Sequence, residues 1–177
     1  VRFSPVDPLF GDVDGDRVPD LAVGRLPVRT GAELASLIDK ILAYGQKDYE
    51  GKAVFAADDW APFTDVSELL LAQAPSDWGV QRAYLESQPV DQARDALFNA
   101  IDGGVALANY VGHAGYTWWS SKKLMTTADV ETLRNAGHPM VVTQWACWSA
   151  YYVRPSGDTL ADKLLLSDGR GAVAVAG

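Results

Sequence analysis

Short apolar runs bounded by turn residues recur along the chain, and helix-like stretches separate them. The runs cover residues 21–28, 52–58, 80–86, 104–113, 139–147 and 171–177, and their length and composition predict β-strands. The stretches between them predict helices at residues 30–45, 64–74, 90–102, 126–135 and 158–167. Several runs are apolar without alternation, which is typical of strands buried on both faces. We therefore expect an α/β fold in which helices cover both faces of a mostly parallel sheet.

The clearest of the predicted helices covers residues 30–45. Thr30 and Glu33 have the spacing of a capping box at its start, and Gly45 can end it. One apolar stripe runs along it, formed by Leu34, Leu37, Ile38, Ile41 and Leu42. Such a stripe is expected to pack against the sheet.

The length and net charge of the chain limit the functions to be expected. The chain has 177 residues, 48% of them hydrophobic, which suits one domain with a sizeable core. Its net charge is −8 and no basic stripe occurs, so nucleic acid is not an expected partner. The apolar runs are too short to span a membrane, and no signal-peptide pattern precedes them.

The two ends of the chain indicate a fragment. The chain begins without Met and stops inside the run at 171–177. We expect residues 1–177 to form a single domain truncated at its C-terminus, with further domains of the same parent chain as partners. The single cysteine excludes a disulfide within the chain.

A histidine and the only cysteine close two consecutive predicted strands. His113 ends the run at 104–113, and Cys147 ends the next run. Functional groups in an open parallel sheet gather beyond the carboxyl ends of the strands, so these two side chains are expected at the same edge. His138 lies at the start of the second run and is expected roughly 25–30 Å away, at the opposite edge.

A thiol and an imidazole at one edge suit nucleophilic acyl transfer. The thiolate attacks a carbonyl carbon, the imidazole moves protons, and backbone N–H groups stabilise the oxyanion. The N–H groups of Ala114 and Cys147 are the candidate oxyanion donors, each worth ~3 kcal/mol when aligned. Aromatic residues nearby are candidates for the walls of a peptide cleft: Trp118, Trp119, Trp145, Trp148, Tyr151 and Tyr152. The alternative is structural, because a lone cysteine is usually an inert buried thiol and aromatic clusters are usually core.

These same stretches resemble a known family. "NYVGHAGYTWW" at 109–119, "VVTQWAC" at 141–147 and "GDVDGDRVPDLAVGRLPVRT" at 11–30 are similar to the gingipain-type cysteine peptidases, peptidase family C25, whose fold is caspase-like. The resemblance implies a secreted or cell-surface endopeptidase with His113 as catalytic histidine and Cys147 as nucleophile. It also implies sortase-like transpeptidation as an alternative. This chain departs from the family pattern at Ala114, where the family usually has glycine, and in lacking a glycine shortly after Cys147.

The resemblance also bears on substrate specificity. Gingipains that cut after basic residues use an acidic side chain from a loop ahead of the catalytic histidine, and this chain offers Asp58, Asp59 and Asp65 there. Asp65 fits best by position, which implies a preference for Arg or Lys. The alternative is that Thr64 and Asp65 simply cap the following helix.

The stretch "DVDGDRVPD" has the spacing of a calcium loop. Positions 1, 3, 5 and 9 are carboxylates and position 7 offers a carbonyl: Asp12, Asp14, Asp16, Asp20 and Val18. Arg17 and Val23 replace the glycine and the bidentate glutamate of an EF-hand, which excludes that motif. A shorter structural Ca²⁺ loop and a solvated acidic turn both remain open.

The sequence therefore predicts a cysteine endopeptidase that acts on a peptide or protein and needs no cofactor for catalysis. Ligands for a catalytic zinc are lacking near His113 and Cys147. The rival prediction is a non-catalytic, calcium-stabilised surface module of the same fold. A nucleotide-binding domain ranks below both, because no glycine-rich phosphate loop follows a strand.

Overall fold

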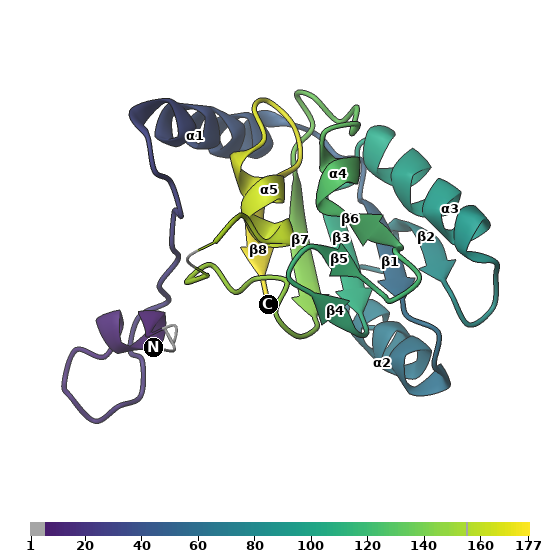
Figure 1. The fold of residues 1–177 in the computed structure, drawn as a ribbon, viewed down its shortest axis with the longest axis horizontal. Helices are drawn as coiled ribbons and strands as arrows, with labels where there is room; N and C mark the ends of the chain where they lie inside the picture. The colour runs from purple at the N-terminus through teal and green to yellow at the C-terminus, as the bar shows by residue number, and fades with distance from the viewer. Residues whose placement is uncertain (1–5, 155) are drawn as a thin grey trace.

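A five-stranded parallel sheet forms the centre of the protein (Figure 1). The structure is a computed structural model that describes residues 6–154 and 156–177. The strand order is β2-β1-β3-β7-β8. The strands are β1 (Lys52–Ala57), β2 (Gly79–Tyr84), β3 (Leu107–Val111), β7 (Met140–Trp145) and β8 (Ala172–Ala176). Five of the six predicted strand runs are thus confirmed.

Helices cover both faces of this sheet, as the apolar runs predict. On β1, Val54 and Ala56 face one side while Phe55 and Ala57 face the other, and all four are buried. The first side packs against α3 (Val90–Asp102), α4 (Thr127–Val130) and α5 (Leu160–Leu166). The second side packs against α2 (Ala61–Leu71). The predicted fold class is confirmed.

Helix α1 (Gly31–Gln46) begins as predicted but buries a different face. The side chain of Thr30 accepts from the backbone N–H of Glu33 at 3.1 Å, and the side chain of Glu33 accepts in return, so the capping box is formed. The helix packs against β8 and α5 and buries Leu37 and Lys40. The rest of the predicted stripe is exposed: Leu34, Ile38, Ile41 and Leu42. The buried Lys40 ammonium instead donates to carbonyl oxygens around the end of α5, at 2.9 Å for Ser167 and 3.1 Å for Arg170.

The predicted strand at 21–28 is wrong. This stretch follows a short 3₁₀ turn, η1 (Asp7–Phe10), and runs in extended form without pairing to any strand of the described residues. Leu21 is 60% exposed and Leu26 is 46% exposed. An apolar run becomes a strand only when a neighbouring strand takes its hydrogen bonds. The segment contacts the body through Arg29, which binds Asp158 at 2.7 Å, and through Arg25, which lies over the ring of Tyr152.

The connection from β3 to β7 holds a small antiparallel sheet rather than one long helix. Its strands are β4 (Ala114–Gly115), β5 (Trp118–Trp119) and β6 (Met125–Thr126). The predicted helix at 126–135 shortens to α4. Beyond it, the N–H groups of Thr132 and Leu133 donate to the carbonyls of Asp129 and Val130, three residues back, and the Asn135 side chain bonds the N–H and carbonyl of Gly171.

Helix α2 begins earlier than predicted. It starts at Ala61, with Trp60 at the N-cap and Pro62 in the first turn. Thr64 and Asp65 therefore lie inside the helix, and the prediction that they cap it is wrong. Asp65 is exposed.

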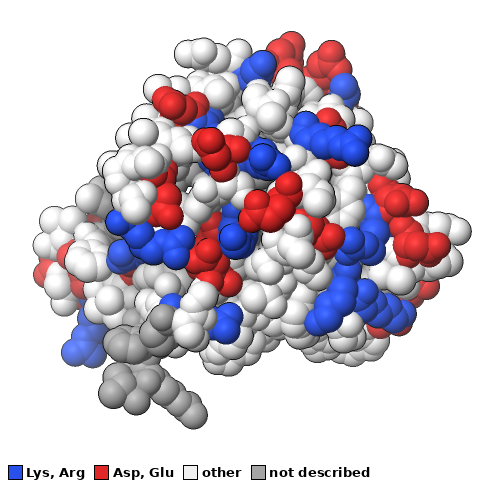
Figure 2. All heavy atoms as spheres, turned by 45° about the horizontal axis from the view of Figure 1, so that its top comes forward, with Lys and Arg blue, Asp and Glu red and all other residues white. Residues whose placement is uncertain are grey.

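Charged side chains of both signs are interspersed over the face shown in Figure 2, and neither sign gathers into a stripe there. Among the described residues, no helix has the length and apolar character needed to cross a membrane.

Candidate active site

The pairing of β3 with β7 brings His113 and Cys147 to one edge of the sheet. The two strands are direct parallel neighbours, with Val111 opposite Trp145. The N–H of Gly112 donates to the carbonyl of Trp145 at 3.3 Å, so the ladder continues one step beyond the strands. His113 and Cys147 each come two residues after the paired positions, and both are exposed. Neighbouring strands lie about 4.8 Å apart, which is within reach of the two side chains.

His138 lies at the opposite edge, as expected. It precedes β7, where its ring meets Tyr49 edge-on with the centroids 6.4 Å apart. Its backbone N–H donates to the carbonyl of Asn135. His138 is therefore separated from Cys147 by the length of β7.

The backbone at His113 is held by a carboxylate that follows β1. Asp58 is 5% exposed, and its Oδ2 accepts from the backbone N–H of His113 at 3.2 Å. Its Oδ1 accepts from the N–H of Asp59 at 2.8 Å. From the other side, the ring of Phe63 on α2 meets the imidazole edge-on at 5.1 Å between centroids. A side chain at Gly112 would lie 2.4 Å from Cβ of Asp58, so only glycine fits this turn.

The sequence prediction considered Asp58 only as a residue for substrate specificity and missed this contact. A signal for it exists in the sequence. Asp58 directly follows a buried strand, at the same kind of position as His113 and Cys147.

The peptide group between His113 and Ala114 is also fixed. The His113 carbonyl accepts from the hydroxyl of Tyr110 at 2.6 Å and from the N–H of Ser120 at 2.8 Å. Ala114 lies opposite Trp119 in the β4–β5 pair. The Ser120 bond makes this a non-hydrogen-bonded pair, so the Ala114 N–H points away from β5.

The loop after Cys147 turns sharply and packs on the loop after His113. Ser149 donates its N–H to the Cys147 carbonyl at 2.7 Å, and Trp148 between them has φ 62°, in the left-handed region. The rings of Tyr116, Trp148 and Tyr151 contact one another at centroid distances of 5.3 to 6.0 Å. These contacts tie the two loops together.

The aromatic residues predicted to wall a cleft differ in exposure and in what they face. Trp145 and Trp148 are exposed at the edge, at 60% and 53%, and Trp118 is half-buried beneath the Lys123 ammonium. Tyr152 faces the N-terminal segment, where Arg25 lies over its ring.

Trp119 is the one cleft residue that the structure contradicts. It is fully buried, stacks on Tyr110 at 4.7 Å, and donates its indole N–H to Gln144 at 2.8 Å. Adjacent residues of a strand point to opposite faces, so Trp118 and Trp119 cannot both line one groove.

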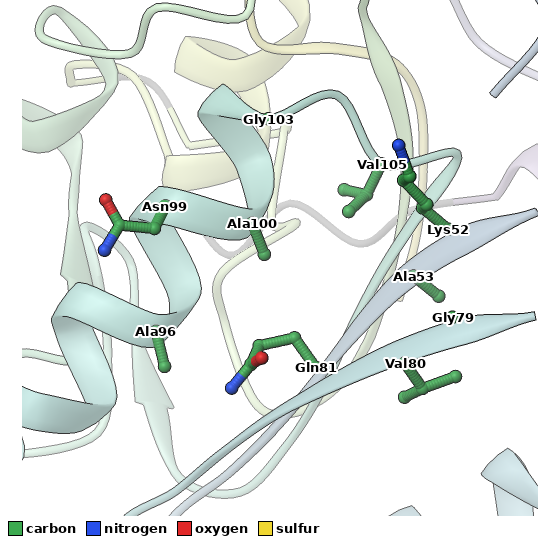
Figure 3. Close-up of a pocket in the computed structure, with 10 residues that line it drawn as sticks. All are labelled: Lys52, Ala53, Gly79, Val80, Gln81, Ala96, Asn99, Ala100, Gly103 and Val105. Carbon is green, nitrogen blue, oxygen red and sulfur yellow. The ribbon is translucent and has the colours of Figure 1, made fainter. Parts of the chain in front are cut away.

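Two hollows lie at opposite edges of the sheet. One, of about 410 Å³, lies at the carboxyl ends of β7 and β8 and is lined by Thr143, Gln144, Trp145, Ala146, Ala176 and Gly177. The other, of about 640 Å³, lies between α3 and the starts of β1 and β2, with Gln81 and Asn99 among its lining residues (Figure 3). Only the first lies at the edge that carries Cys147.

Three of the predicted calcium ligands come together. Carboxylate oxygens of Asp12, Asp14 and Asp20 lie within 4.8 Å of one another. The Oδ1 of Asp16 accepts a hydrogen bond from the backbone N–H of Val18 at 2.7 Å. Arg17 has φ 72°, the left-handed conformation that glycine usually supplies at that loop position. The clustered oxygen donors suit a hard cation such as Ca²⁺.

Comparison with known proteins identifies the family of this chain. The profile of peptidase family C25 matches residues 2–177. The chain belongs to peptidase family C25. Among its relatives, Lys-gingipain W83 of Porphyromonas gingivalis is 26% identical over 163 residues, which cover 84% of this chain and 9% of that protein. Gingipain R2 of the same organism is 24% identical and covers 80% of this chain and 21% of that protein.

The C25 fold is supported by solved structures as well. The Arg-specific cysteine proteinase gingipain R superposes with a TM-score of 0.71 at 19% identity, over 96% of this chain and 42% of the other. A second chain, named only as a protease, gives 0.77 at 20% identity over 96% and 39%. This C25 chain thus spans about a tenth to a fifth of its curated relatives and about two fifths of the solved chains.

Proposed function

We propose that this domain is a cysteine endopeptidase in which Cys147 is the nucleophile and His113 the general acid and base. The observation that carries the proposal is the strand register, which sets both residues two positions beyond the Val111–Trp145 pair on adjacent strands. Membership of family C25 and the peptidase names of its relatives support the same activity.

These two side chains and one water molecule are sufficient for the hydrolysis of a peptide bond. The Cys147 thiolate attacks the scissile carbonyl carbon, and the carbonyl oxygen takes the negative charge. As the C–N bond breaks, the His113 imidazolium gives its proton to the leaving amine, and a thioester remains. His113 then takes a proton from water, whose oxygen attacks the thioester. The C–S bond breaks, which returns the thiolate and releases the acid.

We assign the stabilisation of the oxyanion to the backbone N–H groups of Ala114 and Cys147. Ala114 is absent from the described non-glycine residues with positive φ, so its methyl group causes no backbone strain. The departure from glycine at this position is therefore compatible with a working donor. The departure after Cys147 is larger, because Trp148 takes a left-handed conformation that favours glycine.

Activity is tested with internally quenched peptides that carry Arg, Lys, Asp or Ala at one position. We expect cleavage by the parent protein, and loss of at least about a thousandfold in kcat/KM for both Cys147→Ala and His113→Ala. His138→Ala is the matched control, because this second histidine lies at the other edge, and it should retain activity. Cleavage that survives Cys147→Ala contradicts the proposal.

The alternatives are separated by two further measurements. A non-catalytic module predicts that iodoacetamide labels Cys147 slowly and equally with and without His113. A transpeptidase predicts that added amines divert the acyl group into a new amide in place of the acid. We assign the preference for Arg or Lys to Asp65, which Asp65→Asn should remove while cleavage of other peptides remains.

Two further properties belong to this proposal. The carboxylates of Asp12, Asp14 and Asp20 would hold a structural Ca²⁺, with no part in the chemistry. The relatives are gingipains, which supports action outside the cell on protein substrates and further domains in the parent chain.

A further inference from the structure

A buried hydroxyl lies directly behind the proposed oxyanion site. Tyr110 on β3 is completely buried, and its hydroxyl donates to the His113 carbonyl at 2.6 Å. The Ser120 N–H donates to the same oxygen at 2.8 Å. A carbonyl oxygen has two lone pairs, and two donors at these distances engage both. The orientation of the His113–Ala114 peptide is therefore set from the interior.

The opposite side of that peptide carries the proposed oxyanion donor. All described peptide bonds are trans, and in a trans peptide the C=O and N–H groups point in opposite directions. Because the His113 carbonyl is held by the buried Tyr110, the Ala114 N–H must point away from the interior. The β4–β5 register agrees, since it leaves this N–H outside the ladder.

We infer that Tyr110 is a positioning residue for the oxyanion site: its hydroxyl holds the His113–Ala114 peptide so that the Ala114 N–H faces the substrate carbonyl oxygen. This inference rests on the proposed peptidase function. Tyr110 touches no substrate itself and acts through the backbone alone.

The surroundings of Tyr110 keep its hydroxyl in one place. Its ring stacks on Trp119 with an interplanar angle of 7°, and the Trp119 indole is in turn bonded to Gln144 on β7. Burial raises the pKa of Tyr110, and the nearby Asp58 carboxylate raises it further, so the hydroxyl keeps its proton and remains a donor. A Cβ at Gly112 would lie 2.6 Å from the Tyr110 hydroxyl oxygen, so glycine there leaves room for the contact.

The test is Tyr110→Phe, which keeps the stacked ring and removes one donor. The matched control is Tyr49→Phe. Tyr49 is also buried, and its hydroxyl also donates to a backbone carbonyl, that of Pro139 at the opposite edge of the sheet. We expect kcat for a cleaved peptide to fall about tenfold or more in Tyr110→Phe with KM changed less than about twofold. Tyr49→Phe should keep its kcat.

A second reaction distinguishes a misdirected Ala114 N–H from a general loss of order at the site. Methyl methanethiosulfonate converts the Cys147 thiolate to a mixed disulfide and releases methanesulfinate, with no carbonyl and no oxyanion. Its rate should be equal in the parent protein and in both variants. Urea unfolding identifies the folded fraction to which each rate refers.

The outcomes are distinct. A parent protein that cleaves no peptide overturns the proposed function and this inference with it. In an active parent, Tyr110→Phe with kcat within twofold overturns the inference alone. So does a fall in kcat accompanied by an equal fall in the rate of disulfide formation, because that shows a disordered site rather than a misdirected N–H.

Discussion

Replacing Asp58 by Asn should loosen the turn that carries His113. The carboxylate accepts two backbone N–H groups, from Asp59 at 2.8 Å and from His113 at 3.2 Å, in a buried position. An Asn side chain offers only one oxygen and turns its NH₂ group toward the second donor. One charge-assisted bond is lost and a buried N–H is left unpaired, which costs about 2 kcal/mol.

The assay is urea unfolding at neutral pH, and Asp59→Asn is its matched control. Asp59 is the next residue and also an aspartate, but its partner is Lys122 in a half-exposed ion pair, whose loss costs about 0.5 kcal/mol. We expect Asp58→Asn to lower the free energy of unfolding by about 2 kcal/mol and Asp59→Asn by much less. Since the His113 N–H is one of the two donors, the rate of peptide cleavage should fall only in Asp58→Asn. Equal effects of the two substitutions on stability and cleavage would refute this reasoning.

Three further predictions concern stability. Burial raises the pKa of Asp129, but bonds from Arg94 and Thr126 outweigh it and hold the pKa below its ordinary value of 3.8. The stability that Asp129 contributes is therefore present above about pH 4 and lost below it, so the difference in unfolding free energy between the parent and Asp129→Asn should shrink as acid is added. Lys40→Met should lower the free energy of unfolding by about 3 kcal/mol, because it leaves several partly buried carbonyls around the end of α5 without their donor; a change below 1 kcal/mol contradicts this. Calorimetric titration should show heat of binding with Ca²⁺ that Asp14→Asn abolishes, and equal heats in both proteins would exclude the site.

The sequence predicts the sheet because buried parallel strands carry their signal locally. The run at 52–58 is apolar at successive positions, and β1 is buried on both faces. The run at 21–28 is also mostly apolar, but pairing depends on a neighbouring strand, about which the sequence of the run carries no information. In the same way, the pattern puts Asn135 in a helix, but this residue lies beyond the end of α4 and its side chain bonds Gly171, far along the chain. Local patterns predict elements, and distant partners decide which of them form.

The placement of His113 and Cys147 at one edge of the sheet was predictable from the sequence, and the contacts that hold the backbone there were not. His113 and Cys147 stand out because each closes a strand-like run. Asp58 closes another such run, yet its role depends on which strand lies beside β3. The sequence does not separate Trp118 from Trp119, because the two-residue strand β5 that turns them to opposite faces forms by pairing with β4 and β6.

At the edge of the sheet that carries His113 and Cys147, the residues that stabilise the fold differ from those proposed to react. The side chains that support the loop backbone are buried: Asp58, Tyr110 and Trp119. His113 and Cys147 are exposed, and in the described hydrogen bonds they take part only through their backbone groups. Substitutions of the exposed pair therefore remove few folded-state contacts, and substitutions of the buried group remove many. A single substitution at His113 or Cys147 can therefore abolish the proposed reaction while the fold is kept. For this reason, activity in this domain must be measured at Cys147 itself and does not follow from the fold.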